Sequence, residues 1–265
     1  MPLPPLVTTP LTSGTIAYRI AGTGVPLVLL HGLAGNSRSF IRQFEFFAGD
    51  HQVIAWDAPG YGGSDDLAAD IDLFTDALHE LTAVLGLARF VLLGHSMGGV
   101  LAARYAARFP DQLRGLILSC THVGNGLAKG TALPAGYRNR INDLNTMSPG
   151  DYGRARATAM LAADTPAGIF QLAAEISAET RARGLENAAR VIMETDNSDG
   201  LAALALPTLI IAGAVDPVVP PEKTARLRQL VNQATYAEIA GAGHAPYLEK
   251  PEPYNAAVQS FIGGL

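Results

Sequence analysis

The chain has 265 residues and carries 19 basic against 24 acidic side chains, a net charge of −5, which argues against a large electrostatic surface for nucleic acid or anionic lipid. Apolar residues make up 48% of the chain and charged residues 16%, so it can bury a core and is not a disordered polymer. One cysteine, Cys120, excludes an intrachain disulfide framework and a cysteine-rich zinc site.

Short apolar runs bounded by turn residues predict the strands. Residues 14–20, with a turn at 22–24, predict an antiparallel start to a sheet. The next five runs are apolar on both alternating faces, which is typical of strands buried between two helix layers; they are residues 27–30, 53–56, 90–93, 116–119 and 208–212. An alternating run at 235–239 predicts a further strand nearer an edge.

Helical patterns separate these strands. An apolar stripe from Phe74 to Leu85 predicts a helix that Asp70 or Asp72 caps and Gly86 ends. An alanine-rich helix is predicted from residue 97 to 109, and further helices at 222–230 and 252–261. The alternation of strands and helices predicts an α/β fold with a doubly wound, mostly parallel sheet.

The strand signal disappears between residues 125 and 199. Prolines divide this stretch, rich in alanine, arginine and glutamate, into short helical segments. We therefore expect a small helical cap at 125–199, inserted after the sixth strand between two core segments, 1–124 and 200–265. Its basic and acidic residues balance, which is typical of solvated helix faces. Its apolar residues are candidates to line a pocket, but we expect most of them to pack the cap onto the core; they include Leu133, Tyr137, Ile141, Leu144, Met147, Met160, Leu161, Ile169, Phe170, Leu172 and Met193.

The sequence Gly94-His95-Ser96-Met97-Gly98 fits the G-x-S-x-G nucleophile elbow, in which a serine sits on a tight turn between a strand and a helix. The pattern follows a predicted buried strand and precedes a predicted helix. Its small residues let the two elements approach, and the serine hydroxyl then projects at a helix N-terminus, where an oxyanion is favoured. His95 is expected to point away from the serine.

A serine nucleophile needs a base and an acid that orients the base. His244 lies in a loop after the last predicted strand, where such a sheet places site residues, and is the preferred base; His122 is the main competitor. Asp216 follows a buried strand and would alone be an ordinary turn aspartate before a proline. The order Ser96, Asp216, His244 favours the catalytic interpretation. His31, His51 and His79 are interpreted as structural.

An oxyanion hole needs backbone N–H donors aimed at the developing charge. Met97, directly after the predicted nucleophile, is expected to supply one donor. Leu33 is expected to supply the other, because Gly32 lets the loop after the first buried strand come close.

Together, His31-Gly32, the segment from Asp57 to Ser64, the elbow from Gly94 to Gly99, Asp216 and Gly243-His244 resemble the α/β-hydrolase superfamily over nearly the whole chain. The general impression is nearest to small carboxylesterases and 3-oxoadipate enol-lactonases, and the inserted helices resemble the variable cap of that superfamily. A serine at the elbow disfavours dehalogenases and epoxide hydrolases, which use an aspartate. The Gly-His-Ser elbow, and the absence of a tryptophan soon after His244, lower the expectation of carbon–carbon bond hydrolysis.

The resemblance implies a serine hydrolase that cleaves a small-molecule ester or lactone through an acyl-enzyme. Two alternatives stay open: a carbon–carbon or amide hydrolase with the same triad, and a ligand-sensing protein with little turnover. No phosphate-binding loop, dinucleotide fingerprint or zinc-binding histidine pair occurs, so we expect neither cofactor nor metal. Without a signal-peptide pattern or membrane span, we expect a cytoplasmic monomer or homodimer that binds neither nucleic acid nor membrane.

Overall fold

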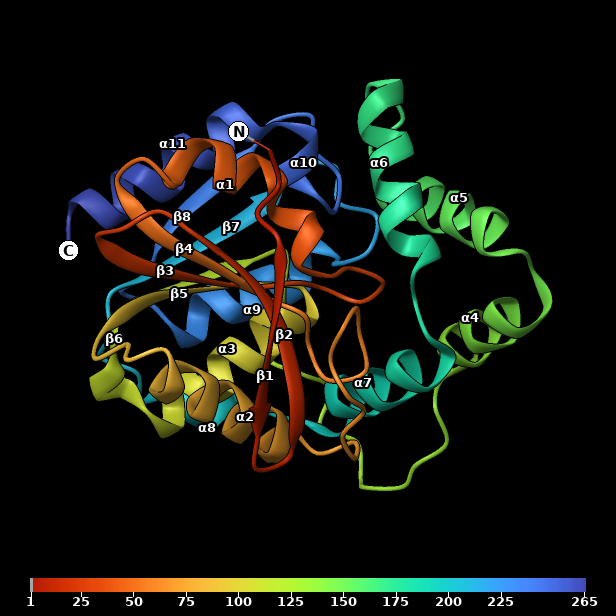
Figure 1. The fold of residues 1–265 in the computed structure, drawn as a ribbon, viewed down its shortest axis with the longest axis horizontal. Helices are drawn as coiled ribbons and strands as arrows, with labels where there is room; N and C mark the ends of the chain where they lie inside the picture. Colours follow the sequence, from red (N-terminus) through yellow and green to blue (C-terminus); the bar gives the residue numbers. More distant parts are fainter. Residues whose placement is uncertain (1) are drawn as a thin grey trace.

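A computed structural model describes residues 2–265 as a single mixed sheet with helices on both faces and a group of helices beyond one end of it (Figure 1). The sheet has eight strands in the order β1-β2-β4-β3-β5-β6-β7-β8. The strands are β1 (Leu6–Leu11), β2 (Gly14–Ala21), β3 (Val25–Leu30), β4 (His51–Trp56), β5 (Phe90–His95), β6 (Leu113–Ser119), β7 (Thr208–Gly213) and β8 (Thr235–Ile239). The predicted doubly wound, mostly parallel α/β sheet is confirmed.

The start of the sheet differs in detail from the prediction. β2 is the expected antiparallel strand, but its partners are β1 and β4, and Gly22 to Gly24 lead into β3 instead of closing a hairpin. The strand β1 was not predicted. Its residues are half-buried or exposed and include Pro10, so its sequence lacks the continuous apolar run of a central strand.

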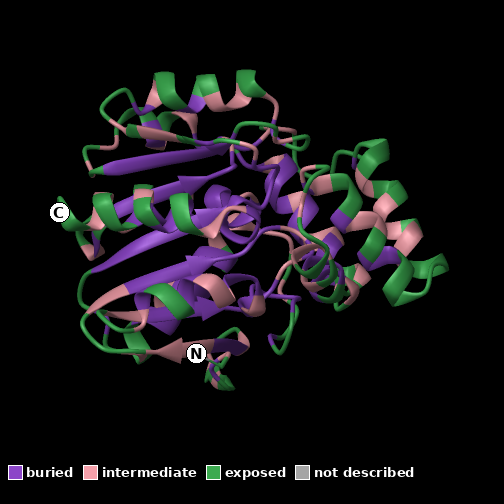
Figure 2. Ribbon diagram, turned by 90° about the horizontal axis from the view of Figure 1, so that it is seen from above, coloured by how far each residue is buried: buried purple, intermediate pink, exposed green. Residues whose placement is uncertain are grey.

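Two hydrophobic clusters fill the two faces of the sheet, and alternate residues of each central strand belong to different clusters. Along β3, Leu27 and Leu29 pack on one face, and Val28 and Leu30 on the other. Figure 2 shows the strands buried between helices whose outer faces are exposed. This alternation explains why runs within the central strands, such as residues 27–30 and 90–93, are apolar at successive positions.

Helices α1 (Ile41–Phe47), α10 (Pro246–Glu249) and α11 (Pro251–Gly263) contribute to one cluster; α2 (Ile71–Val84), α3 (Met97–Arg108) and α9 (Pro221–Leu230) contribute to the other. The short 3-10 turn η1 (Ser37–Phe40) adds Phe40 to the same cluster as α1, whereas the 3-10 turn η2 (Pro110–Gln112) has no buried residue. The Asp70 side chain caps α2 by accepting from the Asp72 N–H at 2.9 Å; of the two predicted caps, Asp70 and Asp72, Asp70 is therefore the one observed.

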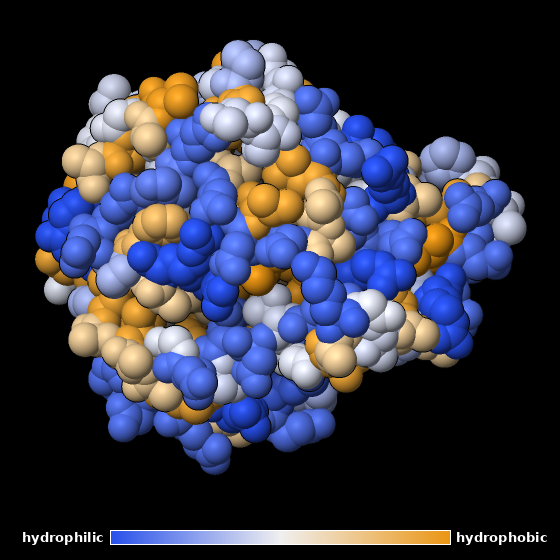
Figure 3. Space-filling view, turned by 90° about the horizontal axis from the view of Figure 1, so that it is seen from below, coloured by the Kyte–Doolittle hydropathy of each residue, from blue (hydrophilic) through white to orange (hydrophobic). Residues whose placement is uncertain are grey.

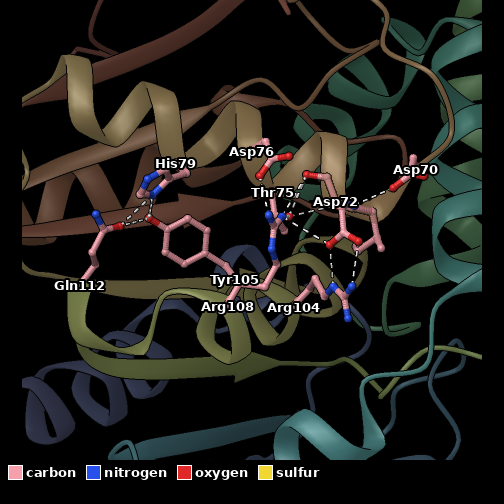
Figure 4. Close-up of polar contacts among 10 residues, drawn as sticks. Asp70, Asp72, Thr75, Asp76, His79, Arg104, Tyr105, Arg108 and Gln112 are labelled. Carbon is pink, nitrogen blue, oxygen red and sulfur yellow. Dashed lines mark hydrogen bonds and ion pairs between the residues drawn. The ribbon is translucent and has the colours of Figure 1, made fainter.

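Polar contacts join α3, the helix behind the elbow, to α2 (Figure 4). Arg104 donates from Nε and Nη2 to the two carboxylate oxygens of Asp72, both at 2.8 Å. Farther along, His79 lies 3.1 Å from Gln112 Oε1 and stacks on the Phe109 ring at 4.0 Å. These contacts hold α2 against α3 and the segment that follows it, and none of them involves a residue of the elbow.

Five helices follow β6 before the chain returns to the sheet at β7: α4 (Ala135–Thr146), α5 (Pro149–Met160), α6 (Ala167–Ala178), α7 (Ala182–Glu194) and α8 (Ser198–Ala202). This confirms a helical insert after the sixth strand. In Figure 1, α4 to α7 stand beyond the end of the sheet, and the cap protrudes from a surface of interspersed apolar and hydrophilic residues in Figure 3. α8 spans the predicted boundary at residue 199 and packs on α3 and α9, so the exact limits of the cap stay a prediction.

No helix in the described part of the chain combines the length and apolar character needed to cross a membrane.

Candidate active site

Ser96 occupies the turn between β5 and α3 with a φ of +53°, in the left-handed region that L-residues rarely adopt. The two glycines of the motif allow this turn. A Cβ on Gly94 would lie 2.2 Å from the Gly98 carbonyl oxygen, and a Cβ on Gly98 would lie 2.2 Å from the Leu30 carbonyl oxygen. Any larger residue at either position would therefore push the helix off the sheet.

The structure brings Ser96, His244 and Asp216 together at the carboxyl ends of β5, β8 and β7. Ser96 Oγ lies 3.0 Å from His244 Nε2, and His244 Nδ1 lies 2.9 Å from Asp216 Oδ2. These are hydrogen-bond distances, and they connect the hydroxyl to the carboxylate through one imidazole.

Asp216 is held in place from its other side as well. Its Oδ1 accepts from the Val218 and Val219 N–H groups at 2.7 and 3.1 Å. Burial alone would raise the pKa of the Asp216 carboxyl, but its hydrogen bond to His244, the His244 charge and the two backbone donors outweigh burial and lower it. The aspartate is therefore ionised, as a partner for an imidazolium must be.

Glu249 holds the loop that carries His244, and the sequence reasoning missed it. Its buried carboxylate accepts from Gly243 N at 3.1 Å and from Ala245 N at 2.9 Å, the residues on either side of the histidine. It also accepts from Ala162 N at 2.7 Å and the Thr165 hydroxyl at 3.0 Å, in the turn between α5 and α6. In the sequence, the only indication of this role is that an acidic residue stands five positions after the predicted base.

A second connection joins the cap to the histidine loop. The backbone N–H of His244 donates to the carbonyl oxygen of Met160, the last residue of α5, at 2.8 Å. The position of the imidazole therefore depends on the cap as well as on the sheet.

The predicted oxyanion donors, Leu33 and Met97, both line the cavity at Ser96. Within residues 2–265, neither backbone N–H donates a hydrogen bond to the protein. Gly32 approaches closely, because a Cβ there would lie 3.0 Å from Ser96 Cβ. Both N–H groups are therefore unpaired in the described structure, as the donors of an oxyanion hole must be before a substrate binds.

His31 supports this loop and does not reach the serine. Its Nδ1 donates to the Gly32 carbonyl at 2.8 Å, and its Nε2 accepts from Ala58 N at 2.9 Å. Burial is the main cause that lowers the pKa of His31, so the ring stays neutral and keeps both bonds.

His95 and His122, which lie near the triad, are also neutral. His95 is buried, and its ring lies 4.9 Å from that of His244 and 4.8 Å from that of Tyr247; burial, and then the charge of His244, lower its pKa. His122, the competing base, lines the cavity but accepts from Gly124 N at 3.0 Å. Burial and the neighbouring Lys223 lower the pKa of His122 to about 4. It bonds to neither Ser96 nor Asp216.

A cavity of about 300 Å³ opens at Ser96 between the core and the cap. The cap contributes six of the described lining residues: Tyr137, Arg140, Arg156, Ala159, Met160 and Ile192. Of the apolar cap residues considered from the sequence, only Tyr137 and Met160 line this cavity. Others pack elsewhere, as expected: Leu133 and Met193 with α4, and Leu161, Ile169, Phe170 and Leu172 against the core.

In the described part of the chain, one group of side chains has the spacing of metal ligands: Cys120, Asp216 and His244, with ligand atoms within 4.8 Å of one another. Asp216 and His244 already bond to each other. Burial, and then the Asp216 charge, raise the pKa of the Cys120 thiol, which disfavours the thiolate that a metal would need. Asp216 and His244 are therefore better suited to the hydrogen-bonded series with Ser96 than to the coordination of a metal ion.

Residues 25–251 match the family described as the alpha/beta hydrolase fold, and the chain belongs to this family. Lipase 3 of Moraxella sp. is 29% identical over 253 residues, which cover 92% of this chain and 79% of that protein. A thermophilic esterase from Thermogutta terrifontis is 27% identical, with a TM-score of 0.86 over 98% of both chains. The enol-lactonase from Burkholderia xenovorans has the same fold, with a TM-score of 0.87 at 21% identity over 97% of this chain and all of that one (100%). The protein is thus an α/β hydrolase with esterase-like and lipase-like relatives.

Proposed function

We propose that the protein is a serine hydrolase that cleaves a carboxylic ester or lactone of a small molecule through an acyl-enzyme. The observation that carries this proposal is the continuous hydrogen-bonded series from Ser96 Oγ through His244 to Asp216, with distances of 3.0 and 2.9 Å. The esterase and lipase among the relatives support the same chemistry.

In the first half of the reaction, Ser96 Oγ attacks the substrate carbonyl and its proton passes to His244 Nε2. The carbonyl oxygen becomes an oxyanion, which the N–H groups of Leu33 and Met97 stabilise. Asp216 stabilises the imidazolium through Nδ1. The imidazolium then protonates the leaving alkoxide, and an acyl group remains on Ser96.

In the second half, His244 takes a proton from a water molecule, which attacks the acyl carbonyl. The tetrahedral intermediate collapses, Ser96 regains its proton from His244, and the acid leaves. With a lactone, the alkoxide stays attached to the acyl chain and leaves in the same hydroxy acid. The cavity of about 300 Å³ lies at the lower end of ligand-site volumes and favours a small substrate.

Labelling with a fluorophosphonate and mapping the adduct by peptide mass tests the nucleophile. We expect the adduct on Ser96, and a fall in kcat of ~10³-fold or more in Ser96→Ala. Ser260→Ala, at an exposed position of α11, is the matched control and should keep label and activity. An unlabelled Ser96, or full esterase activity in Ser96→Ala, refutes the proposal.

A substrate panel distinguishes the alternatives that share this triad. Aryl esters, enol-lactones, vinylogous diketones and amides are compared side by side, and we expect the esters and lactones to be turned over. Cleavage of the diketones or amides with negligible ester cleavage would replace the proposed reaction. Acylation limited to a single turnover across the panel would favour a ligand sensor.

A further inference from the structure

Among the residues that the structure describes, three cationic side chains line the cavity at Ser96, and no aspartate or glutamate does. Arg140 comes from α4 and Arg156 from α5, both in the cap, whereas Lys223 comes from α9 of the core. We call these three residues the cation cluster. The acidic and basic residues of the cap balance as a whole, but at the cavity wall only the basic ones are present.

The cation cluster has no ionic partner in the described part of the protein. No carboxylate oxygen lies within 4.0 Å of a nitrogen of Arg140, Arg156 or Lys223, and Arg140 Nε is buried without a hydrogen-bond partner. Neighbouring cap arginines differ. Arg154, two residues from Arg156 on the same helix, pairs with Asp151 at 2.5 Å, and Arg190 pairs with Glu186 at 3.1 Å.

The arginines are close enough to repel each other. Burial, and then the charge of Arg140, lower the pKa of Arg156, and the charge of Asp143 only partly opposes this. Burial also lowers the pKa of Lys223, and the charge of Glu222 only partly opposes this. Desolvated like charges destabilise a protein unless an anion offsets them, so this wall is complementary to a negatively charged ligand.

Packing and hydrogen bonds already orient two of these cations. The Arg156 guanidinium lies over the Tyr152 ring at 6.0 Å, and Lys223 Nζ donates to Asn125 Oδ1 at 3.0 Å, which leaves its other protons available. A guanidinium offers two parallel N–H groups that match the two oxygens of a carboxylate. The cavity volume of about 300 Å³ leaves room for a small substrate and not for a long chain.

We infer that the substrate carries a free carboxylate in addition to the ester or lactone that is cleaved, and that Arg140, Arg156 and Lys223 bind this carboxylate. The inference rests on the proposed serine hydrolase activity, because it places the reacting carbonyl at Ser96. Hydrolysis of an acyclic substrate whose carboxylate lies on the acyl side releases a dicarboxylic acid and a neutral alcohol.

The test compares each monoethyl ester of succinate, glutarate and adipate with its partner in which a carboxamide replaces the free carboxylate. The pair differs in charge and hardly in size, and the three lengths sample the distance from Ser96 to the cation cluster. For at least one length we expect kcat/KM for the acid to exceed that for the amide by ~10-fold or more, the size of a charge-assisted hydrogen bond. Higher ionic strength should reduce this ratio.

Variants of the cation cluster identify the cause of the preference. Arg140→Gln, Arg156→Gln and Lys223→Gln should each lower the acid-to-amide ratio, and Arg156→Lys should retain more of it than Arg156→Gln. Arg154→Gln, which removes an exposed and ion-paired charge from the same helix, should leave the ratio unchanged. A ratio near or below one for all three lengths, or an equal fall in Arg154→Gln and the cluster variants, overturns the inference.

A binding measurement separates this inference from the proposed activity. Calorimetric titration of Ser96→Ala with glutarate and adipate at low ionic strength should show binding that Arg156→Gln in the same background weakens ~10-fold or more. If no ester is hydrolysed but the diacids bind in this way, the proposed function fails and the carboxylate site stands. If esters are hydrolysed but no diacid binds, the carboxylate site fails and the hydrolase stands.

Discussion

Replacing Glu249 with glutamine should weaken both the fold and the active site. The side chain is 5% exposed, and its Oε1 accepts from Ala245 N while its Oε2 accepts from Gly243 N, Ala162 N and the Thr165 hydroxyl. Glutamine has nearly the same shape but only one acceptor oxygen and no charge. Its NH₂ group must therefore face at least one N–H donor.

The size of the loss in stability depends on whether the glutamine oxygen takes the Oε1 or the Oε2 position of the carboxylate. At the Oε2 position it keeps up to three bonds and turns the NH₂ toward Ala245 N; at the Oε1 position it keeps only that one. Even the better choice loses one charge-assisted bond and leaves a buried donor unpaired, each worth ~1–3 kcal/mol. We expect the free energy of unfolding to fall by about 2–4 kcal/mol.

The active site should respond separately, because Gly243 and Ala245 flank His244 in the chain. If either anchor is released, the 3.0 Å contact between His244 Nε2 and Ser96 Oγ is no longer fixed. Misplacement of a reacting group by about 1 Å can cost ~10²-fold, so kcat should fall at least ~10-fold with a smaller change in KM.

Urea unfolding monitored by fluorescence gives the stability of the Glu249→Gln variant, and initial rates on an ester substrate give kcat and KM. Glu252→Gln, at an exposed position in the first turn of α11, is the matched control; it should leave kcat unchanged and lower the free energy of unfolding by less than about 1 kcal/mol. A Glu249→Gln protein with wild-type kcat and a free energy of unfolding within about 0.5 kcal/mol of wild type would refute this account of the carboxylate.

Three further changes have distinct expected outcomes. Gly98→Ala should fold poorly or lose activity, because its Cβ would lie 2.2 Å from the Leu30 carbonyl oxygen; circular dichroism and esterase assays measure this. His122→Gln should reduce the amount of stability that the protein loses as the pH is lowered. The folded pKa of about 4 lies below the unfolded ~6.5, so the unfolded chain binds more protons between these pH values, and wild-type stability falls there by up to about 3 kcal/mol as pH decreases. Arg104→Gln should cost less than about 1 kcal/mol in urea unfolding and leave kcat unchanged, because its ion pair with Asp72 is partly exposed.

Each of these outcomes has a counterpart that would contradict it. Gly49→Ala, where a Cβ would meet no atom within 4 Å, controls for a general effect of removing a glycine, so a Gly98→Ala protein that behaved like it would contradict the close approach. Unfolding curves at pH 4.5 and 7 that lose equal stability in wild type and His122→Gln would contradict the lowered pKa. A cost well above 1 kcal/mol for Arg104→Gln would mean that the ion pair is less screened than its exposure indicates.

The sequence was sufficient to predict the central strands and the elbow, because both leave local signals. Strands buried on both faces contain uninterrupted apolar runs, and the turn at Ser96 demands small residues two positions before and after it. Asp216 and His244 were predicted from their order and their place after strands, although the 2.9 Å contact between them joins residues 28 positions apart. The roles of these residues in catalysis stay a proposal.

Features that depend on distant partners left little trace in the sequence. β1 was missed because it is an edge strand whose residues are largely exposed. Glu249 was missed because two of its partners, Ala162 and Thr165, come from the cap more than 80 residues earlier. The sequence could not single out the cation cluster, because charge counts over the cap do not reveal which arginines face the cavity.

The hydrogen bond from His244 N to the Met160 carbonyl has a consequence for protein engineering. A cap of this kind invites replacement as a module, by grafting the insert of a relative onto the same sheet. Here such a graft would also replace Met160, whose carbonyl oxygen holds the backbone of the proposed base, His244. It would replace Ala162 and Thr165 as well, whose N–H and hydroxyl groups donate to Glu249. A chimera that retains residues 160–165 should therefore accept a new specificity, whereas one that replaces them should lose rate on every substrate.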